Sequence, residues 1–320
     1  MAATAQAFSP ADETLRSPGP EEQWSDSFYF GGADPRGPAF YARIGRRPNE
    51  QRIEGAAGVW LPDGRFLLAW AREPDQGERI ACGPLAFECL RPYGLWRLRL
   101  DGTARLFERP EDVATARDRF ETVEIEGELR FMAWAEEPLS GLALGGAVAA
   151  SHYEQAGSVA GSLRIGAERF GIAGRGMRDH SWGVRDWQNV PYWRWFGMVV
   201  DPETLLLINN VGTPDGGERA GGVLMLDGES APIASCETEA ETDPATGAQR
   251  RFVAHARDEL GREAVLTGEA ISVVPLRQRR DGRLTLVNEA LTRLSWGPHE
   301  GVGLSEFLVQ VEGDPGSADG

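Results

Sequence analysis

Short runs in which apolar and polar residues alternate recur along most of the chain. The segment 95–100 alternates strictly, and the segment 120–134 places Val123, Ile125 and Leu129 on a single face. Because successive side chains of a β-strand point to opposite faces, this alternation predicts half-buried strands. The same pattern returns at residues 251–256, 264–274 and 284–288. We therefore expect an all-β protein.

Turn signals that contain glycine separate these runs, as they do in β-hairpins. They are Pro62-Asp63-Gly64, Asp101-Gly102, Pro214-Asp215-Gly216, Leu260-Gly261 and Asp281-Gly282. Only residues 109–119 and 139–150 could form short helices. Many short strands at even spacing are typical of antiparallel barrels and sandwiches. The length of the patterned region predicts two such halves in tandem, over residues 24–172 and 173–312.

The two ends of the chain lack this pattern. Residues 1–23 are rich in Ala, Ser, Pro and Glu, and residues 313–320 in Gly, Asp and Ser. Such segments have too few large apolar groups to fold, so both ends are expected to be disordered tails. Removing residues 1–22 should then leave the thermal stability unchanged.

Composition excludes several classes of function. The net charge is −16, and all 33 basic residues are arginines. An acidic surface repels nucleic acid and anionic membranes, and a chain without lysine forms neither a Schiff base nor a P-loop. The three cysteines fit neither a disulfide framework nor a zinc site. With no signal-peptide core and no run near ~18 apolar residues, we expect a cytoplasmic protein with no membrane span, for which a homodimer is one option.

The densest chemistry lies in Gly176–Trp187, which holds two carboxylates, one imidazole, two arginines and two indoles, with further aromatic residues just beyond. Buried charges are costly unless paired, so this mixture suits an apolar pocket with ionisable groups at one point. A buried salt-bridge knot is the alternative. It would join Asp179 or Asp186 to Arg175, Arg178 or Arg185.

Several reaction types fit this segment poorly. Asp179 and His180 are adjacent, so on extended backbone they point to opposite faces and cannot share one metal ion. Ser181 lacks a nucleophile-elbow sequence, and no glycine-rich nucleotide loop is present. We expect no metal and no cofactor. An acid beside several indoles is suited to protonating an alkene, because an apolar wall keeps the carboxyl protonated and π faces stabilise a cation.

The strings Arg178-Asp-His-Ser-Trp-Gly183 and Arg185-Asp-Trp187, with His152-Tyr-Glu-Gln155 before them, resemble a known superfamily. It comprises tandem lipocalin-like proteins, among them hydroxyneurosporene synthase (carotenoid 1,2-hydratase), AttH-like proteins and fungal Diels–Alderase-type cyclases. The late Gly301-x-Gly303-x-x-Glu306 string is similar to its closing strand. The resemblance implies two lipocalin-like β-barrels, a hydrophobic unsaturated substrate and cofactor-free chemistry. It transfers the acid to Asp179, whereas His180-Ser181-Trp182 departs from the carotenoid hydratases.

These observations give two functional hypotheses. The first is a hydratase, isomerase or cyclase for a terpenoid-, steroid- or polyketide-like substrate, with Asp179, His180 and His152 as catalytic residues. The second is a non-catalytic carrier or sensor of a hydrophobic small molecule. Asp179 should have a raised pKa at a cavity of at least ~300 Å³, or a lowered pKa in a buried ion pair. The expected substrate-binding residues are Tyr153, Glu154, Trp182, Arg185, Trp187, Trp193, Trp195 and Glu306.

Overall fold

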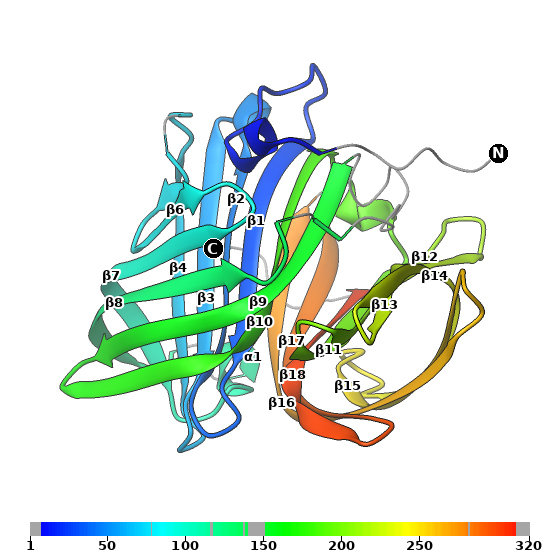
Figure 1. The fold of residues 1–320 in the computed structure, drawn as a ribbon. Helices are drawn as coiled ribbons and strands as arrows, with labels where there is room; N and C mark the ends of the chain where they lie inside the picture. Colours follow the sequence, from blue (N-terminus) through cyan, green and yellow to red (C-terminus); the bar gives the residue numbers. More distant parts are fainter. Residues whose placement is uncertain are drawn as a thin grey trace.

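A computed structural model of the chain describes residues 8–77, 79–115, 118–136, 138–139, 151–280 and 282–311. Within these ranges the chain is almost entirely antiparallel β-structure, arranged as two units side by side (Figure 1). This confirms the all-β fold with two lipocalin-like halves. No helix in the described part of the chain is long and apolar enough to cross a bilayer.

The first unit is a sheet in the order β4-β3-β2-β1-β10-β9-β8-β7-β6-β5. Strand β7 pairs with β8 along its length and also with β4, and the pairing with β4 closes eight of the strands into a barrel. Its interior is a continuous apolar core that includes Phe30, Trp96 and Phe131. The strands are β1 (Trp24–Ala33), β2 (Ala39–Arg47), β3 (Arg52–Trp60), β4 (Phe66–Pro74), β5 (Ala81–Cys82), β6 (Leu85–Arg91), β7 (Leu95–Phe107), β8 (Glu121–Ala133), β9 (Ser151–Ile165) and β10 (Glu168–Val184).

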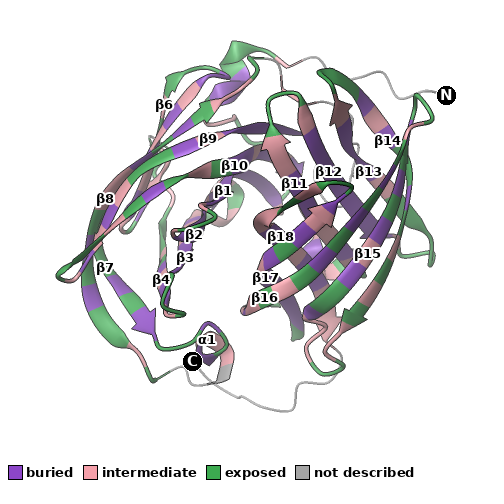
Figure 2. Ribbon diagram, turned by 60° about the horizontal axis from the view of Figure 1, so that its bottom comes forward, coloured by how far each residue is buried: buried purple, intermediate pink, exposed green. Residues whose placement is uncertain are grey.

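The second unit is a closed barrel of the eight strands β11 to β18 in chain order, with β11 pairing to β18. Buried and exposed residues alternate along its strands (Figure 2). Phe196, Phe252 and Phe307 stack at the centre of its core. The strands are β11 (Tyr192–Asp201), β12 (Thr204–Gly212), β13 (Glu218–Leu226), β14 (Glu229–Thr242), β15 (Gln249–Asp258), β16 (Glu263–Arg280), β17 (Arg283–Trp296) and β18 (His299–Val311).

The boundary between the units differs from the expected division at residue 172. Strand β10 runs through that position and pairs with β1 from Ala33↔Arg175 to Trp24↔Val184. The first unit therefore ends near Val184, because the sheet needs the whole of β10 to join β1 to β9.

The described part of the expected N-terminal tail is folded. A short 3₁₀-helix, η1 (Pro10–Glu13), begins after Ser9, and Glu13 is only 1% exposed. The expectation of a disordered tail is therefore wrong for residues 8–23, since the buried acids Asp12 and Glu13 and the partly buried Leu15 anchor this segment. Residues 1–7 and the expected C-terminal tail, 313–320, lie outside the described residues.

Most of the expected turns are present, with Gly64, Gly216, Gly261 and Gly282 all in the left-handed region. Asp101-Gly102 is an exception, because it lies inside β7 rather than in a hairpin. Gly102 has a φ of 143° at the point where β7 passes from its pairing with β6 to its pairing with β4.

Helical structure is sparse. The expected helix at 109–119 is reduced to α1 (Asp112–Thr115). The expected helix at 139–150 falls outside the described residues, apart from Leu139. Two further 3₁₀ turns occur, η2 (Pro48–Glu50) and η3 (Trp187–Asn189).

Four strands face each other where the units meet, β1 and β10 from the first and β11 and β18 from the second (Figure 1). Alternate residues of each strand point into this interface, so their side chains form successive layers that we call rungs. The inner rung is Tyr29, Asp179, Trp195 and Glu306. The middle rung is Gly31, Met177, Gly197 and Leu304, and the outer rung is Ala33, Arg175, Val199 and Val302.

Candidate functional site

A small cavity of about 60 Å³ lies at the inner rung. Strands from both units line it, so it exists only because the two barrels pack together. Its lining mixes aromatic and ionisable side chains: Tyr29, His152, Glu154, Asp179, Arg185, Trp193, Trp195, Asn209, Val211 and Glu306. A cavity of this size has room for a few water molecules, at ~10–15 Å³ each by the same measure.

Two indoles orient the glutamates of this cavity. Trp195 Nε1 donates a hydrogen bond to Glu154 Oε1 at 2.9 Å, and Trp193 Nε1 donates to Glu306 Oε1 at 2.5 Å. His152 Nε2 lies 3.7 Å from Glu154 Oε1. Among the described residues, His152 Nδ1, Glu154 Oε2 and Asn209 Nδ2 are buried without a hydrogen-bond partner. Unsatisfied buried polar atoms are uncommon in native proteins, so these atoms are placed to hold water or a polar group of a ligand.

Both acids contributed by the first unit have raised pKa values. Burial raises the pKa of Asp179 to about 7, against the lowering influence of the Arg185 guanidinium. Burial, reinforced by the neighbouring Asp179 carboxyl, raises the pKa of Glu154 to about 8. Of the two alternatives for Asp179, the structure therefore favours the raised pKa. Protonated carboxyls are thus available here near neutral pH.

The second unit contributes another pair of acids. Glu289 and Glu306 stand directly opposite each other on β17 and β18. Burial, together with the neighbouring Glu306, raises the pKa of Glu289 well above its usual range. Tyr29 Oη also points to Glu289, at 3.5 Å from Oε2. Burial and the neighbouring carboxyl therefore favour the protonated form of Glu289.

Cationic groups at the cavity are few and partly desolvated. Burial lowers the pKa of Arg185 to about 10, and burial with the nearby Arg185 charge lowers the pKa of His152 to about 3. His152 is therefore neutral at physiological pH. Trp187 lies behind the cavity, with its ring packed edge-on against Trp193 and within 5.4 Å of the guanidiniums of Arg43 and Arg185.

The opposite face of β9 and β10 forms a separate polar cluster inside the first barrel. His180 Nε2 lies 2.7 Å from Asp26 Oδ1, and its ring stacks on Phe28 at 3.9 Å. Burial lowers the pKa of His180, although Asp26 opposes this. Tyr153 Oη is 3.3 Å from His180 Nδ1, and Trp182 packs on the same ring. These groups partner one another and do not line the small cavity.

The N-terminal segment completes this second cluster. Glu13 accepts hydrogen bonds from Arg178 Nη2 at 2.6 and 2.7 Å and from Trp96 Nε1 at 2.9 Å. The Tyr153 hydroxyl and the Tyr93 backbone amide donate to the same carboxylate. Burial alone would raise the pKa of Glu13, but Arg178 and these donors hold it below its usual value. The expected salt-bridge knot therefore exists, with Glu13 rather than Asp179 or Asp186 as its acid.

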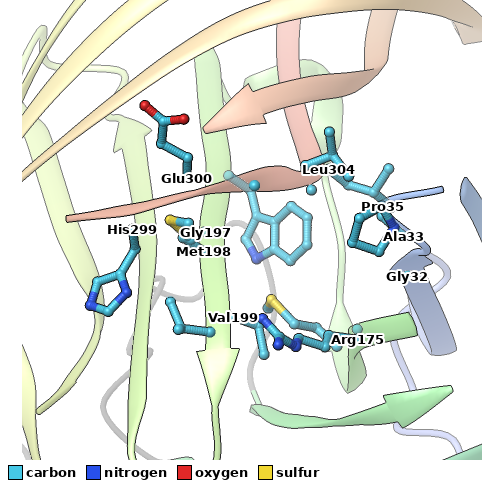
Figure 3. Close-up of a pocket in the computed structure, with 18 of the residues that line it drawn as sticks. Gly32, Ala33, Pro35, Arg175, Gly197, Met198, Val199, His299, Glu300 and Leu304 are labelled. Carbon is cyan, nitrogen blue, oxygen red and sulfur yellow. The ribbon is translucent and has the colours of Figure 1, made fainter. Parts of the chain in front are cut away.

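A larger pocket of about 320 Å³ lies directly beside the small cavity (Figure 3). The middle and outer rungs line it, and Trp195 lines both spaces. Its walls are mostly apolar, from Met177, Met198 and Leu304 among others. A Cβ atom at Gly31 would lie only 2.7 Å from Leu304 Cδ1, so glycine at this position lets Leu304 pack closely against β1.

The structure divides the expected site residues between the two faces of β9 and β10. Seven of them, Asp179, His152, Glu154, Arg185, Trp193, Trp195 and Glu306, line the small cavity. Tyr153, His180 and Trp182 lie in the Glu13 cluster, and Trp187 packs behind Trp193. The structure does not bring His180 to the side of Asp179, as the alternation of the strand requires.

Sequence reasoning missed several residues of the site. Tyr29, Asn209 and Val211 line the cavity, and Glu289 faces it from β17. Their interface-facing positions in β1, β12 and β17 were the available signal, but nothing in the sequence pairs those strands with β10. His299, the first residue of β18, lines the larger pocket, and no sequence motif singled it out.

Among the described residues, no group of three or more His, Cys, Asp and Glu side chains is placed to hold a metal ion. A metal-free and cofactor-free protein therefore remains a prediction.

The raised pKa values predict a stability that depends on pH. Unfolded Asp and Glu release their protons near pH 4, whereas the folded state keeps them until about pH 7 for Asp179 and pH 8 for Glu154. The folded state therefore loses stability as the pH rises from about 4 to the pKa values of the folded protein, about 7 for Asp179 and about 8 for Glu154. Between pH 7 and 8.5 we expect the free energy of unfolding to fall by about 1–2 kcal/mol. The lowered pKa values of His152 and His180 keep both rings neutral in this range.

Urea unfolding at several pH values measures this effect, with Glu154→Gln as the test variant. Because glutamine does not titrate, the variant should show a shallower fall. A free energy of unfolding that rises from pH 7 to 8.5 would contradict the assignment of protonated acids.

Comparisons with known proteins agree with this architecture. A protein from Nitrosomonas europaea, solved as a candidate AttH, superposes with a TM-score of 0.64 at 12% identity, covering 98% of this chain and 99% of that one. Kievitone hydratase from Nectria haematococca superposes with a TM-score of 0.58 at 9% identity, covering 89% of each chain. CghA superposes with a TM-score of 0.57 at 12% identity, covering 98% and 97%. At these identities the likeness establishes the fold.

A search of curated proteins finds no match to the sequence. A family described as a domain of unknown function, DUF7064, matches residues 9–311. The match begins at the folded N-terminal segment and ends at the last described strand, so it spans both barrels and the interface between them. The chain therefore belongs to the DUF7064 family.

Proposed function

We propose that this protein is a cofactor-independent hydratase or isomerase for a hydrophobic unsaturated substrate. The observation that carries this proposal is the adjacency of two spaces that share Trp195. The 320 Å³ pocket has the size and apolar character needed for a substrate. The 60 Å³ cavity beside it holds Asp179 and Glu154 with pKa values of about 7 and 8.

The chemistry follows from these positions. Asp179 donates its proton to one carbon of a double bond, which leaves a carbocation on the substrate and a carboxylate at Asp179. The faces of Trp193 and Trp195 stabilise the cation. In hydration, a water molecule held in the small cavity adds to the cation and returns its extra proton to the carboxylate. In isomerisation, the carboxylate removes a proton from the neighbouring carbon instead.

Each of the other polar groups has a role in this scheme. Glu154 is held by Trp195 Nε1 through Oε1, and its free Oε2 can position the attacking water. His152, neutral because of its lowered pKa, can accept or donate a hydrogen bond to that water through Nδ1. His180 is a positioning residue in this proposal, because it braces β10 from inside the first barrel rather than touching the substrate.

The similarity in fold to kievitone hydratase supports hydration as the first reaction to test. The proposal for this chain nevertheless rests on its own acids and pockets.

Incubation with a panel of isoprenoid and polycyclic alkenes in D₂O tests the proposal whichever product is formed. Protonation of a double bond from exchangeable carboxyls places deuterium on carbon in the hydrated or isomerised product. We expect carbon-bound deuterium, detected by mass spectrometry, in at least one member of the panel. Quantitative recovery of unlabelled compounds that nevertheless bind would instead identify a carrier of hydrophobic ligands.

A further inference from the structure

The larger pocket contains one cation that has no partner. Arg175 belongs to the outer rung on β10, and its guanidinium makes no hydrogen bond or ion pair with any residue that the structure describes. Arg175 is exposed, so its guanidinium is accessible to a ligand that enters the pocket from solvent.

The surroundings of Arg175 explain why it stays unpaired. It extends from β10 across the pocket toward Val199 on β11, between largely apolar walls (Figure 3). Glu300, the one carboxylate among the lining residues, turns away from it at the far side of the mouth. The guanidinium therefore presents its N–H donors to whatever enters the pocket.

The position of Arg175 relative to the acid is fixed by the strand. Arg175, Met177 and Asp179 are successive interface-facing residues of β10, one in each rung. At ~3.3 Å per residue, the Cα atoms of Arg175 and Asp179 lie about 13 Å apart. The pocket occupies the space between them, with Trp195 at its inner end.

We propose that Arg175 binds the anionic head group of an amphipathic carboxylate, whose apolar chain lies across Met177 and Leu304 and points its far end toward Asp179. A guanidinium fork matches a carboxylate in geometry and charge. A single arginine within a strongly acidic protein suits a monoanion better than a phosphate or diphosphate, which would carry more charge than the site can neutralise. The claim that the far end of the ligand reacts at Asp179 rests on the function proposed above. Binding of the head group by Arg175 does not depend on that function.

Isothermal titration calorimetry with two matched probes tests this inference. Farnesoic acid and farnesol share a C15 isoprenoid chain and differ only in the head group. We expect the acid to bind about tenfold more tightly than the alcohol, as for a hydrogen bond to a charged group. Arg175→Gln should remove this difference by weakening the acid alone.

Arg169→Gln is the matched control, because Arg169 is an exposed arginine on the same strand, outside the pocket. It makes the same change in net charge and should leave both affinities unchanged. Equal binding of acid and alcohol to the native protein, equal weakening of both by Arg175→Gln, or no saturable binding of either probe would overturn the proposal. Because no outcome depends on turnover, failure here is distinct from failure of the D₂O experiment.

Discussion

Asp179→Asn should lower turnover by about 10²–10⁴-fold, the range over which a positioned general acid accelerates a reaction. The asparagine side chain has the same shape and still fits the cavity, but it cannot supply a proton to carbon. The rate of product formation under saturating substrate, once the D₂O panel has identified one, measures this loss.

The same variant should keep its stability, and this separates a catalytic role from a structural one. Burial raises the pKa of Asp179 to about 7, so above that pH the ionised carboxylate destabilises the folded state. A neutral amide at this position carries no such cost. At pH 8 we expect the free energy of unfolding to be unchanged or higher than in the native protein. Glu124→Gln, which changes an exposed acid on β8 outside both pockets, is the control for turnover. An Asp179→Asn protein with full turnover, or one that loses several kcal/mol of stability, would contradict the role assigned to this residue.

Glu13→Ala should lower the free energy of unfolding by about 3–5 kcal/mol, the cost of removing one partner of a buried ion pair. Arg178 is 1% exposed, and Glu13 is its only charged partner among the described residues. Without that carboxylate, the guanidinium remains buried beside the ring of Trp96 with its charge uncompensated. Equilibrium unfolding in urea, followed by tryptophan fluorescence, measures the change.

Glu22→Ala supplies the matched control for this result. Glu22 is an exposed acid of the same N-terminal segment, and its replacement should change stability by less than ~0.5 kcal/mol. Deletion of residues 1–22 should be at least as costly as Glu13→Ala, because the deletion removes the same carboxylate together with Phe8 and Leu15, which pack against the first barrel. If Glu13→Ala and the deletion of residues 1–22 both kept the stability of the native protein, the segment would not dock as described.

Sequence patterns predicted the strands well because alternation is a local property. The segments 95–100 and 120–134 became parts of β7 and β8, and 264–274 became part of β16. The closure of each barrel depends on pairings such as β1 with β10 and β11 with β18, which join residues more than a hundred positions apart. No local signal specifies such pairings, so the boundary after β10 was misplaced.

The candidate site, like the fold, was predictable only where neighbouring residues in the sequence determine it. Alternation along β10 correctly separated Asp179 from His180, and the crowding of tryptophans indicated an aromatic pocket. The partners of those residues were not predictable, because they come from distant strands. Glu13 is the clearest example, since its segment has the composition of a tail and its partners Arg178, Trp96 and Tyr153 all come from distant strands.

The docking of Glu13 also sets an order of events during synthesis. Glu13 leaves the ribosome early, but its partner Arg178 is synthesised 165 residues later. Strand β1 is separated from its partner β10 by a similar length of chain. At ~5–20 residues per second, the interval is roughly ten to thirty seconds. During this interval one edge of β1 has no partner strand. The apolar faces of β1 to β4 stay uncovered, because the barrel cannot close before β10 is present. Nascent chains of this protein therefore expose unpaired strand edges and apolar surface for much of translation. We expect the first barrel to bind chaperones that act at the ribosome during this time.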